Sequence, residues 1–204
     1  LRAGGLEDMS RPKGEMEDSE EAAINDAKII EAGDCVICLA ASGNTNYPVT
    51  IMEICKKLGA TTIGIANNPD TKLLENSDIP ILLPTPPEVI AGSTRLGAGT
   101  AQKIALNMMS SCMGVYLGNV MDGMMVNLIA NNTKLFKRSE EIVINITGCN
   151  RDQAVQSLKK SKGSVKLAIL LIEGAKTLNE AKHFLDKEMQ NLRRAISALR
   201  AEEI

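Results

Sequence analysis

The sequence predicts an α/β domain with a mainly parallel sheet, followed by a small helical bundle. Three short apolar segments bounded by turn residues are the expected strands, at residues 35–40, 61–66 and 79–83. They alternate with helix-like segments, and this spacing is typical of βαβ units with parallel strands. From about Thr133 the pattern changes to short helices with charged faces, which predicts the bundle.

The composition predicts a soluble globular protein with an aliphatic core. Hydrophobic residues make up 44% of the 204 residues, but aromatic residues make up only 2%, so aliphatic and Met side chains must fill the interior. The net charge of -2 gives no general attraction for nucleic acid or for an anionic membrane. We therefore expect small molecules or proteins as partners, and neither nucleic acid nor membrane.

The five cysteines, an odd number in a chain without a signal peptide, predict reduced thiols and a cytoplasmic location. Cys35 and Cys38 form a C-x-x-C inside an expected strand, where positions three apart point to opposite faces. This arrangement favours structural thiols over a redox pair or a metal site. The sequence has no His-based triad, zinc pattern or Walker loop, and its one histidine, His183, is expected on a helix surface.

The loop at residues 39–45 joins the first expected strand to a helix. Unpaired N–H groups at the first turn of a helix attract anions, and Ser42 and Thr45 add hydroxyl groups. On these residues alone the loop is either a phosphate cradle or a plain tight turn. Ligands of parallel sheets bind beyond the carboxyl ends of the strands, where we expect this loop, Asn67-Asn68 and residues 84–88 to converge.

The remaining pattern predicts helices. An acidic stretch at residues 15–27 is typical of a solvated helix face. The stretch Glu88–Lys103 begins a long helix that ends near Tyr116, and Ser93 and Thr94 are either its N-caps or ligand contacts. Residues 104–130 are apolar but repeatedly interrupted by polar side chains, which predicts buried core rather than a membrane span. The other expected helices are residues 48–58, 134–146, 150–159, 165–172 and 178–200.

Three stretches of this sequence carry a family resemblance. They are Ala40-Ala-Ser-Gly-Asn-Thr-Asn-Tyr-Pro48, Pro87-Glu-Val-Ile-Ala-Gly-Ser-Thr-Arg-Leu-Gly-Ala-Gly-Thr-Ala-Gln-Lys103, and Ala3-Gly-Gly5 followed by Glu15-Met-Glu-Asp18. Together they resemble the N-acetylmuramic acid 6-phosphate etherases of the sugar isomerase (SIS) superfamily. The resemblance extends over nearly the whole chain.

The resemblance implies an SIS-type three-layer α/β/α domain over residues 1–132 and a small helical domain over residues 133–204. It implies cleavage of the D-lactyl ether of N-acetylmuramic acid 6-phosphate, without cofactor or metal, by a homodimer whose interface includes the small-residue helix after Gly97. Glu17 matches a family glutamate that acts as acid/base. The positions implied to hold phosphate and sugar are Ser42, Gly43, Asn44, Thr45, Glu88, Ser93 and Thr94.

The sequence also departs from the family pattern. The family's other catalytic glutamate, its first sheet strand and a first glycine-rich loop lie upstream of the Ala-Gly-Gly turn, where this chain begins. Gly97 stands where Lys is usual, and Asn127 where Asp is common. One alternative is therefore a non-catalytic sugar-phosphate sensor similar to the glucokinase regulatory proteins. Another is an aldose–ketose isomerase, which the Glu88–Lys103 motif disfavours.

Overall fold

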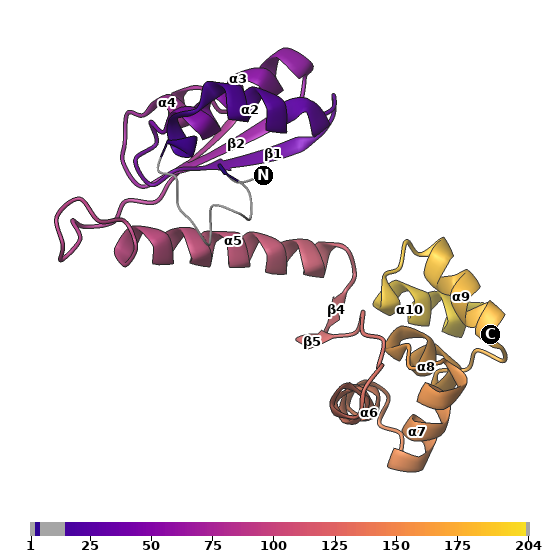
Figure 1. Ribbon diagram of the computed structural model, residues 1–204. Helices are drawn as coiled ribbons and strands as arrows, with labels where there is room; N and C mark the ends of the chain where they lie inside the picture. The colour runs from indigo at the N-terminus through magenta and orange to yellow at the C-terminus, as the bar shows by residue number, and fades with distance from the viewer. Residues whose placement is uncertain (1–2, 5–14, 203–204) are drawn as a thin grey trace. The chain divides into compact units, whose positions relative to one another are not determined.

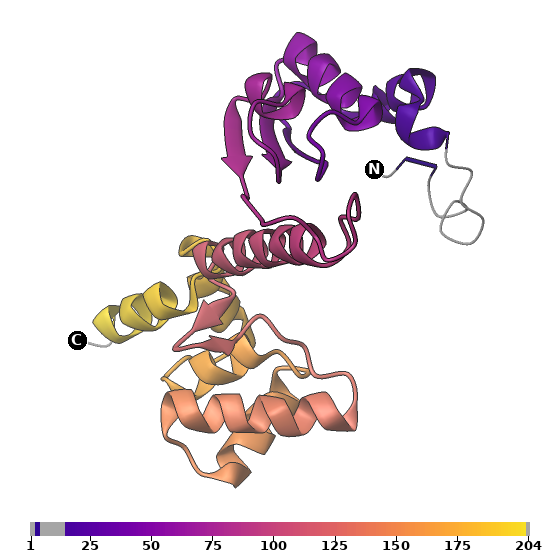
Figure 2. The ribbon, with the colours of Figure 1, turned by 90° about the vertical axis from the view of Figure 1, so that its left-hand side faces the viewer.

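The computed structural model describes residues 3–4 and 15–202. The chain forms two compact units, residues 1–107 and 108–204. Figure 1 labels their helices and strands, and Figure 2 shows the same ribbon turned by 90° about the vertical axis. Gly5 and Gly14, which belong to the motifs around Glu17, lie outside the described residues.

A parallel sheet organises the first unit. Its strands are β1 (Cys35–Leu39), β2 (Thr61–Ala66) and β3 (Ile79–Leu82), in the order β1-β2-β3. The three predicted strands are thus confirmed to within one residue. Pro80 lies in β3 and pairs only with β2 among the described strands, which suits a residue without a backbone N–H because proline is tolerated at a sheet edge.

Helices cover one face of this sheet. Helix α3 (Asn46–Leu58) packs on β1 and β2, α2 (Glu20–Asp26) packs on α3, and α4 (Lys72–Glu75) packs on β2 and β3 (Figure 1). The sequence did not predict α4, which has only four residues. Its close approach depends on Gly64, because a Cβ there would lie 2.5 Å from the carbonyl oxygen of Leu73.

The core of the first unit lies between the sheet and these helices. It contains Met52 and Cys55 of α3, both fully buried, together with Ala23 of α2 and Cys38 of β1. Cys35 is exposed whereas Cys38 is buried, as expected for two strand positions three residues apart. The acidic stretch forms α2, flanked by the short 3-10 helices η1 (Met16–Asp18) and η2 (Ala27–Ile29).

The long helix α5 (Gly97–Tyr116) corrects two predictions. It begins at Gly97 and not at Glu88, because residues 88–96 form turns and extended backbone. It is also not buried core, since Ala98 is the only buried residue along it, and Met108 and Tyr116 are 62% and 89% exposed. An apolar composition predicted burial, but apart from Ala98 the described residues leave the side chains of this helix partly or fully exposed.

Five helices build the second unit around one apolar core. They are α6 (Thr133–Thr147), α7 (Arg151–Lys160), α8 (Val165–Ile172), α9 (Leu178–Lys187) and α10 (Leu192–Glu202). Phe184, Leu158 and Ile169 are among the buried residues of this core. Asn150 caps α7 in a capping box with Gln153. His183 is exposed, as predicted. No helix in the described part of the chain is long and apolar enough to cross a membrane.

A β-hairpin lies where the sequence predicted continuous buried core. Strands β4 (Val120–Met121) and β5 (Met124–Met125) pair antiparallel across Asp122-Gly123. Both turn residues have positive φ, 50° and 75°, which is the conformation that an Asp-Gly pair supplies in two-residue hairpins. The Asp-Gly pair between apolar residues was the signal in the sequence that could have predicted this hairpin.

The helix predicted over residues 178–200 is interrupted between α9 and α10. Met189 and Gln190 have φ values of 49° and 64°, which end α9 and turn the chain. The ammonium group of Lys166 donates to the carbonyl oxygen of Gln190 at 2.7 Å, and burial lowers the pKa of this lysine. The contact that stabilises the break comes from α8, 24 residues away, and is therefore invisible to local sequence patterns.

Tyr47 links helices α2 and α3 through a hydrogen bond. Its hydroxyl donates to Asp26 Oδ2 at 2.5 Å, which joins the first turn of α3 to the end of α2. The side chain is only 5% exposed. Burial and the hydrogen bond to the Asp26 carboxylate both raise the pKa of the Tyr47 phenol, so the group stays a donor well above neutral pH.

We predict that Tyr47→Phe lowers the free energy of unfolding by about 1–2 kcal/mol, because it removes a hydrogen bond to a carboxylate at a buried position. Urea denaturation followed by circular dichroism measures this change. The matched control is Tyr116→Phe, since Tyr116 is the only other tyrosine and is 89% exposed. Equal effects of the two substitutions would show that the Tyr47–Asp26 contact does not stabilise the fold.

Candidate active site

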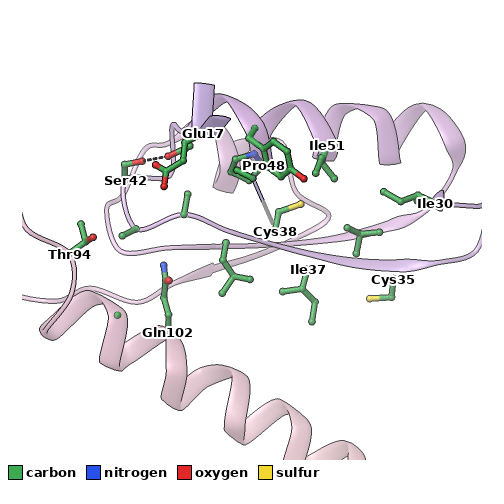
Figure 3. A pocket seen from close by; sticks show the side chains of 18 of the residues that line it. Glu17, Ile30, Cys35, Ile37, Cys38, Ser42, Pro48, Ile51, Thr94 and Gln102 are labelled. Carbon is green, nitrogen blue, oxygen red and sulfur yellow. Dashed lines mark hydrogen bonds between the residues drawn. The ribbon is translucent and has the colours of Figure 1, made fainter. Parts of the chain in front are cut away.

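A cavity of about 920 Å³ lies along β1 and the loop that follows it. Figure 3 shows the side chains that line it, with Ser42 and Glu17 labelled together with Thr94 and Gln102. Its walls come from β1, the first turns of α3 and α5, and the short helix η1. The carboxyl end of a parallel strand is where such sheets bind ligands, so this is the candidate site.

The loop between β1 and α3 arranges hydroxyl groups at one end of the cavity. Ser42 Oγ and Thr45 Oγ1 lie 3.1 Å apart and share a hydrogen bond, drawn as the dashed line in Figure 3. The backbone N–H of Asn44 donates to Ser42 Oγ at 3.2 Å. Both Ser42 and Thr45 line the cavity, so their hydroxyl groups are available to a ligand there.

The first turn of α3 adds backbone donors to this loop. Among the described residues, the N–H groups of Asn46 and Tyr47 have no hydrogen-bond acceptor, and Thr45 does not cap the helix with its side chain. The next residue, Pro48, has no N–H to satisfy. Free N–H groups at the positive end of a 13-residue helix favour an anion such as a phosphate.

Hydrogen bonds from the neighbouring strand end and from α4 fasten the loop. The carbonyl oxygen of Ala41 accepts from the N–H of Asn67 at 3.1 Å and from Asn68 Nδ2 at 3.0 Å. Asn44 Oδ1 accepts from the N–H of Lys72 at 3.1 Å, so this side chain holds the loop against α4. The expected convergence of the loop with Asn67-Asn68 is therefore present.

Gly43 has the tightest surroundings in the loop. Its φ is +71°, and a Cβ at this position would lie 2.4 Å from Thr71 Oγ1. Its carbonyl oxygen also accepts from the N–H of Leu73 at 3.0 Å. The loop can follow this path only with glycine, because any side chain would have to displace Thr71 at the start of α4.

Glu17 reaches the same cavity from a different part of the chain. It lies in η1, which packs against α3, and its side chain is exposed and lines the cavity. An exposed carboxylate beside an anion-binding loop can exchange protons with a bound ligand. Glu17, Ser42, Thr45 and Thr94 are thus brought to one cavity.

Four of the positions expected to hold phosphate and sugar do not line the cavity: Gly43, Asn44, Glu88 and Ser93. Glu88 Oε1 accepts from the N–H of Ala98 at 3.2 Å, so its carboxylate caps the start of α5, where we expected Ser93 or Thr94 as N-cap. A Cβ on Gly97 would lie 3.8 Å from the same carboxylate oxygen. The roles expected for Glu88 and Ser93 in ligand binding remain predictions.

Most of the cavity lining was not predicted as site residues, and Gln102 and Cys38 are two examples. Gln102 of α5 lines the cavity, and Cys38 lies in its wall. Burial, with a further contribution from the nearby Cys55, raises the pKa of the Cys38 thiol to about 12, so this sulfur is a protonated wall group and not a nucleophile. Within residues 3–4 and 15–202, no three His, Cys, Asp or Glu side chains are grouped to hold a metal ion.

The fold and the strand-end loop define an SIS domain. An SIS domain family model matches residues 5–111, which is the part of the chain that contains the sheet and the cavity. Proteins that are similar in sequence then identify the family within this class of SIS-domain proteins.

The relatives are named N-acetylmuramic acid 6-phosphate etherase. The chain is 43% identical to the one from Symbiobacterium thermophilum over 171 residues, which cover 83% of this chain and 57% of the relative. It is 41% identical to etherase 2 of Bacillus licheniformis over 198 residues, 96% of this chain and 66% of the relative. The Geobacillus thermodenitrificans etherase is 40% identical, with 96% and 67% covered.

The chain therefore belongs to the N-acetylmuramic acid 6-phosphate etherase family of SIS-domain proteins. It spans between 57% and 67% of the length of these relatives.

We predict that Gly43→Ala disrupts the loop and destabilises the first unit by about 1–3 kcal/mol, because the added methyl group collides with Thr71. Urea denaturation measures the loss. Gly59→Ala is the matched control, since Gly59 has a similar φ of +78° but no atom within 4 Å of an added Cβ. If the two variants lose the same stability, backbone strain alone explains the effect and the contact with Thr71 does not.

Proposed function

We propose that this protein catalyses an etherase-type carbon–oxygen lyase reaction on N-acetylmuramic acid 6-phosphate, in the cytoplasmic recycling of cell-wall amino sugars. The products are N-acetylglucosamine 6-phosphate and D-lactate. One observation carries the proposal: a carboxylate, Glu17, lines the same cavity as the hydroxyl groups of an anion-binding loop. The names of the relatives supply the substrate.

In the proposed complex the loop at residues 42–45 is the anchor for the phosphate. The hydroxyl groups of Ser42 and Thr45 and the free N–H groups of Asn46 and Tyr47 all donate to phosphate oxygens. Gly43 and Asn44 keep the loop in place through their contacts with α4. Thr94 and the Glu88-capped start of α5 are next to the sugar.

Glu17 then acts as acid/base. A base removes the proton at carbon 2, next to the aldehyde of the open-chain sugar, and the electron pair expels the lactyl oxygen from carbon 3. The departing oxygen takes up a proton as D-lactate. Water then adds across the double bond between carbons 2 and 3, with its hydroxyl group bonding to carbon 3 and a proton returning to carbon 2. Each step moves a proton to or from a carboxyl group or water, and a positioned carboxylate accelerates such transfers by about 10²–10⁴-fold.

The face of the parallel sheet opposite α3 is partly exposed to solvent. This exposure affects how the activity must be assayed. Ile37 and Ile79, which share this face with Ile63, are 36% and 48% exposed. Parallel sheets are normally covered on both faces, and the relatives are longer than this chain. The part of a relative that lies outside its match to this chain should therefore be supplied in the assay as a separate polypeptide.

The sensor and isomerase alternatives have less support. The relatives reported above are all named as etherases, and no feature of the described residues favours regulation over catalysis. Gly97 in place of the family lysine was one of the features that suggested a sensor, and it lies beside the Glu88 cap of α5.

We also propose a homodimer in which a second copy covers α5. Only Lys103 is charged among its 20 residues, and Met108 and Val115, seven residues apart on one helix face, are 62% and 58% exposed. A helix that is apolar on its exposed faces needs a partner surface.

We predict that Glu17→Gln reduces D-lactate release from N-acetylmuramic acid 6-phosphate by about 10²–10⁴-fold, because the amide cannot exchange the proton. The assay uses this chain alone and with the part of the Bacillus licheniformis relative that lies outside its match to this chain. Glu15→Gln is the control, since Glu15 is an exposed neighbour that does not line the cavity. Lactate release that is unaffected by Glu17→Gln would exclude the proposed role. Saturable sugar-phosphate binding with no lactate in either condition would favour the sensor.

We predict that Met108→Glu converts the dimer to a monomer, because it places two charges in an apolar interface. Sedimentation velocity measures the molecular mass of both forms. Met189→Glu is the control, as Met189 is 77% exposed and lies outside α5. A wild-type chain that sediments as a monomer at every concentration tested would refute the proposed dimer.

A further inference from the structure

Gln102 extends from α5 into the candidate site. It lies in the second turn of the helix, is half-buried and lines the cavity. Figure 3 shows its side chain pointing from α5 toward the sheet, on the side where Ile37 lies. The proposed mechanism does not use this residue.

Asn67 determines which way the Gln102 amide faces. Asn67 is only 6% exposed, and its Nδ2 donates to the carbonyl oxygen of Leu83 at 3.0 Å. Because a carbonyl oxygen only accepts, the nitrogen end of Asn67 must face Leu83, and its Oδ1 faces α5. Gln102 Nε2 donates to this Oδ1 at 2.9 Å.

This arrangement leaves Gln102 Oε1 as an acceptor for a ligand. Among the described residues no donor is hydrogen-bonded to it, while its amide nitrogen is held by Asn67. Ile37 and Leu39 line the same cavity and provide apolar surface. An acetamido group matches this combination, because it has one N–H donor and one methyl group.

We propose that Gln102 determines the specificity of this site for N-acetylated sugar phosphates. Its Oε1 accepts a hydrogen bond from the acetamido N–H at carbon 2, and the methyl group packs on the apolar wall of the cavity. Asn67 is a positioning residue that holds the Gln102 amide in the accepting orientation. The inference rests on the proposed function, since that function supplies the N-acetylated sugar.

The test compares two ligands that differ at carbon 2. Calorimetry measures the dissociation constants of N-acetylglucosamine 6-phosphate and of 2-deoxyglucose 6-phosphate, which has no donor at that carbon. The wild type should prefer the acetylated sugar. Gln102→Leu should reduce that preference by about 3- to 10-fold, the range of one neutral hydrogen bond, and leave the binding of the 2-deoxy sugar unchanged.

Two further variants separate specificity from folding. Asn67→Ala should also reduce the preference, because it frees the Gln102 amide to rotate. Gln156→Leu is the matched control, as Gln156 is exposed on α7 and should leave both dissociation constants unchanged.

The possible results are distinct. If Gln102→Leu weakens the binding of both ligands equally, Gln102 only supports the fold. If the preference for the acetylated sugar is unchanged and lactate release is intact, this inference is overturned and the proposed function stands. If the wild type binds neither sugar phosphate, both alone and with the added part of the Bacillus licheniformis relative, the proposed function fails and this inference with it.

Discussion

The carboxyl end of β2 holds the candidate site together through one buried residue. Asn67 bonds three segments at once: its N–H donates to Ala41, its Nδ2 donates to Leu83, and its Oδ1 accepts from Gln102. These segments are the binding loop, the end of β3 and the first turns of α5. Because a buried amide costs free energy unless its polar atoms are bonded, all three contacts must form together.

The proposed anion-binding part of the site depends on backbone geometry more than on charged side chains. Its donors are N–H groups at the start of α3 and two hydroxyl groups, and the loop path requires a glycine pressed against Thr71. Such donors are fixed by the fold before a ligand arrives, so little ordering is needed on binding. Glu17 belongs neither to this loop nor to α3, because it lies on the short 3-10 helix η1.

The helical unit shows the same dependence of local structure on distant contacts. Lys166 reaches from α8 to the carbonyl oxygen of Gln190 and supports the break between α9 and α10. A Cβ on Gly118 would lie 2.8 Å from the Cα of Asn191, so the segment before the hairpin approaches the same break closely. Residues 178–200 look like one helix only when these contacts are unknown.

The sequence by itself determined the three strands, α3 and the position of the loop between β1 and α3, because turn residues and apolar periodicity are local signals. Through the family motifs, the sequence also predicted as site residues four residues that line the cavity, Ser42, Thr45, Thr94 and Glu17. Tertiary structure alone decided that Glu88 caps α5, that α5 is exposed, and that Gln102 lines the cavity. The physical reason is that these outcomes depend on which groups from distant segments meet, and a linear pattern does not contain that information.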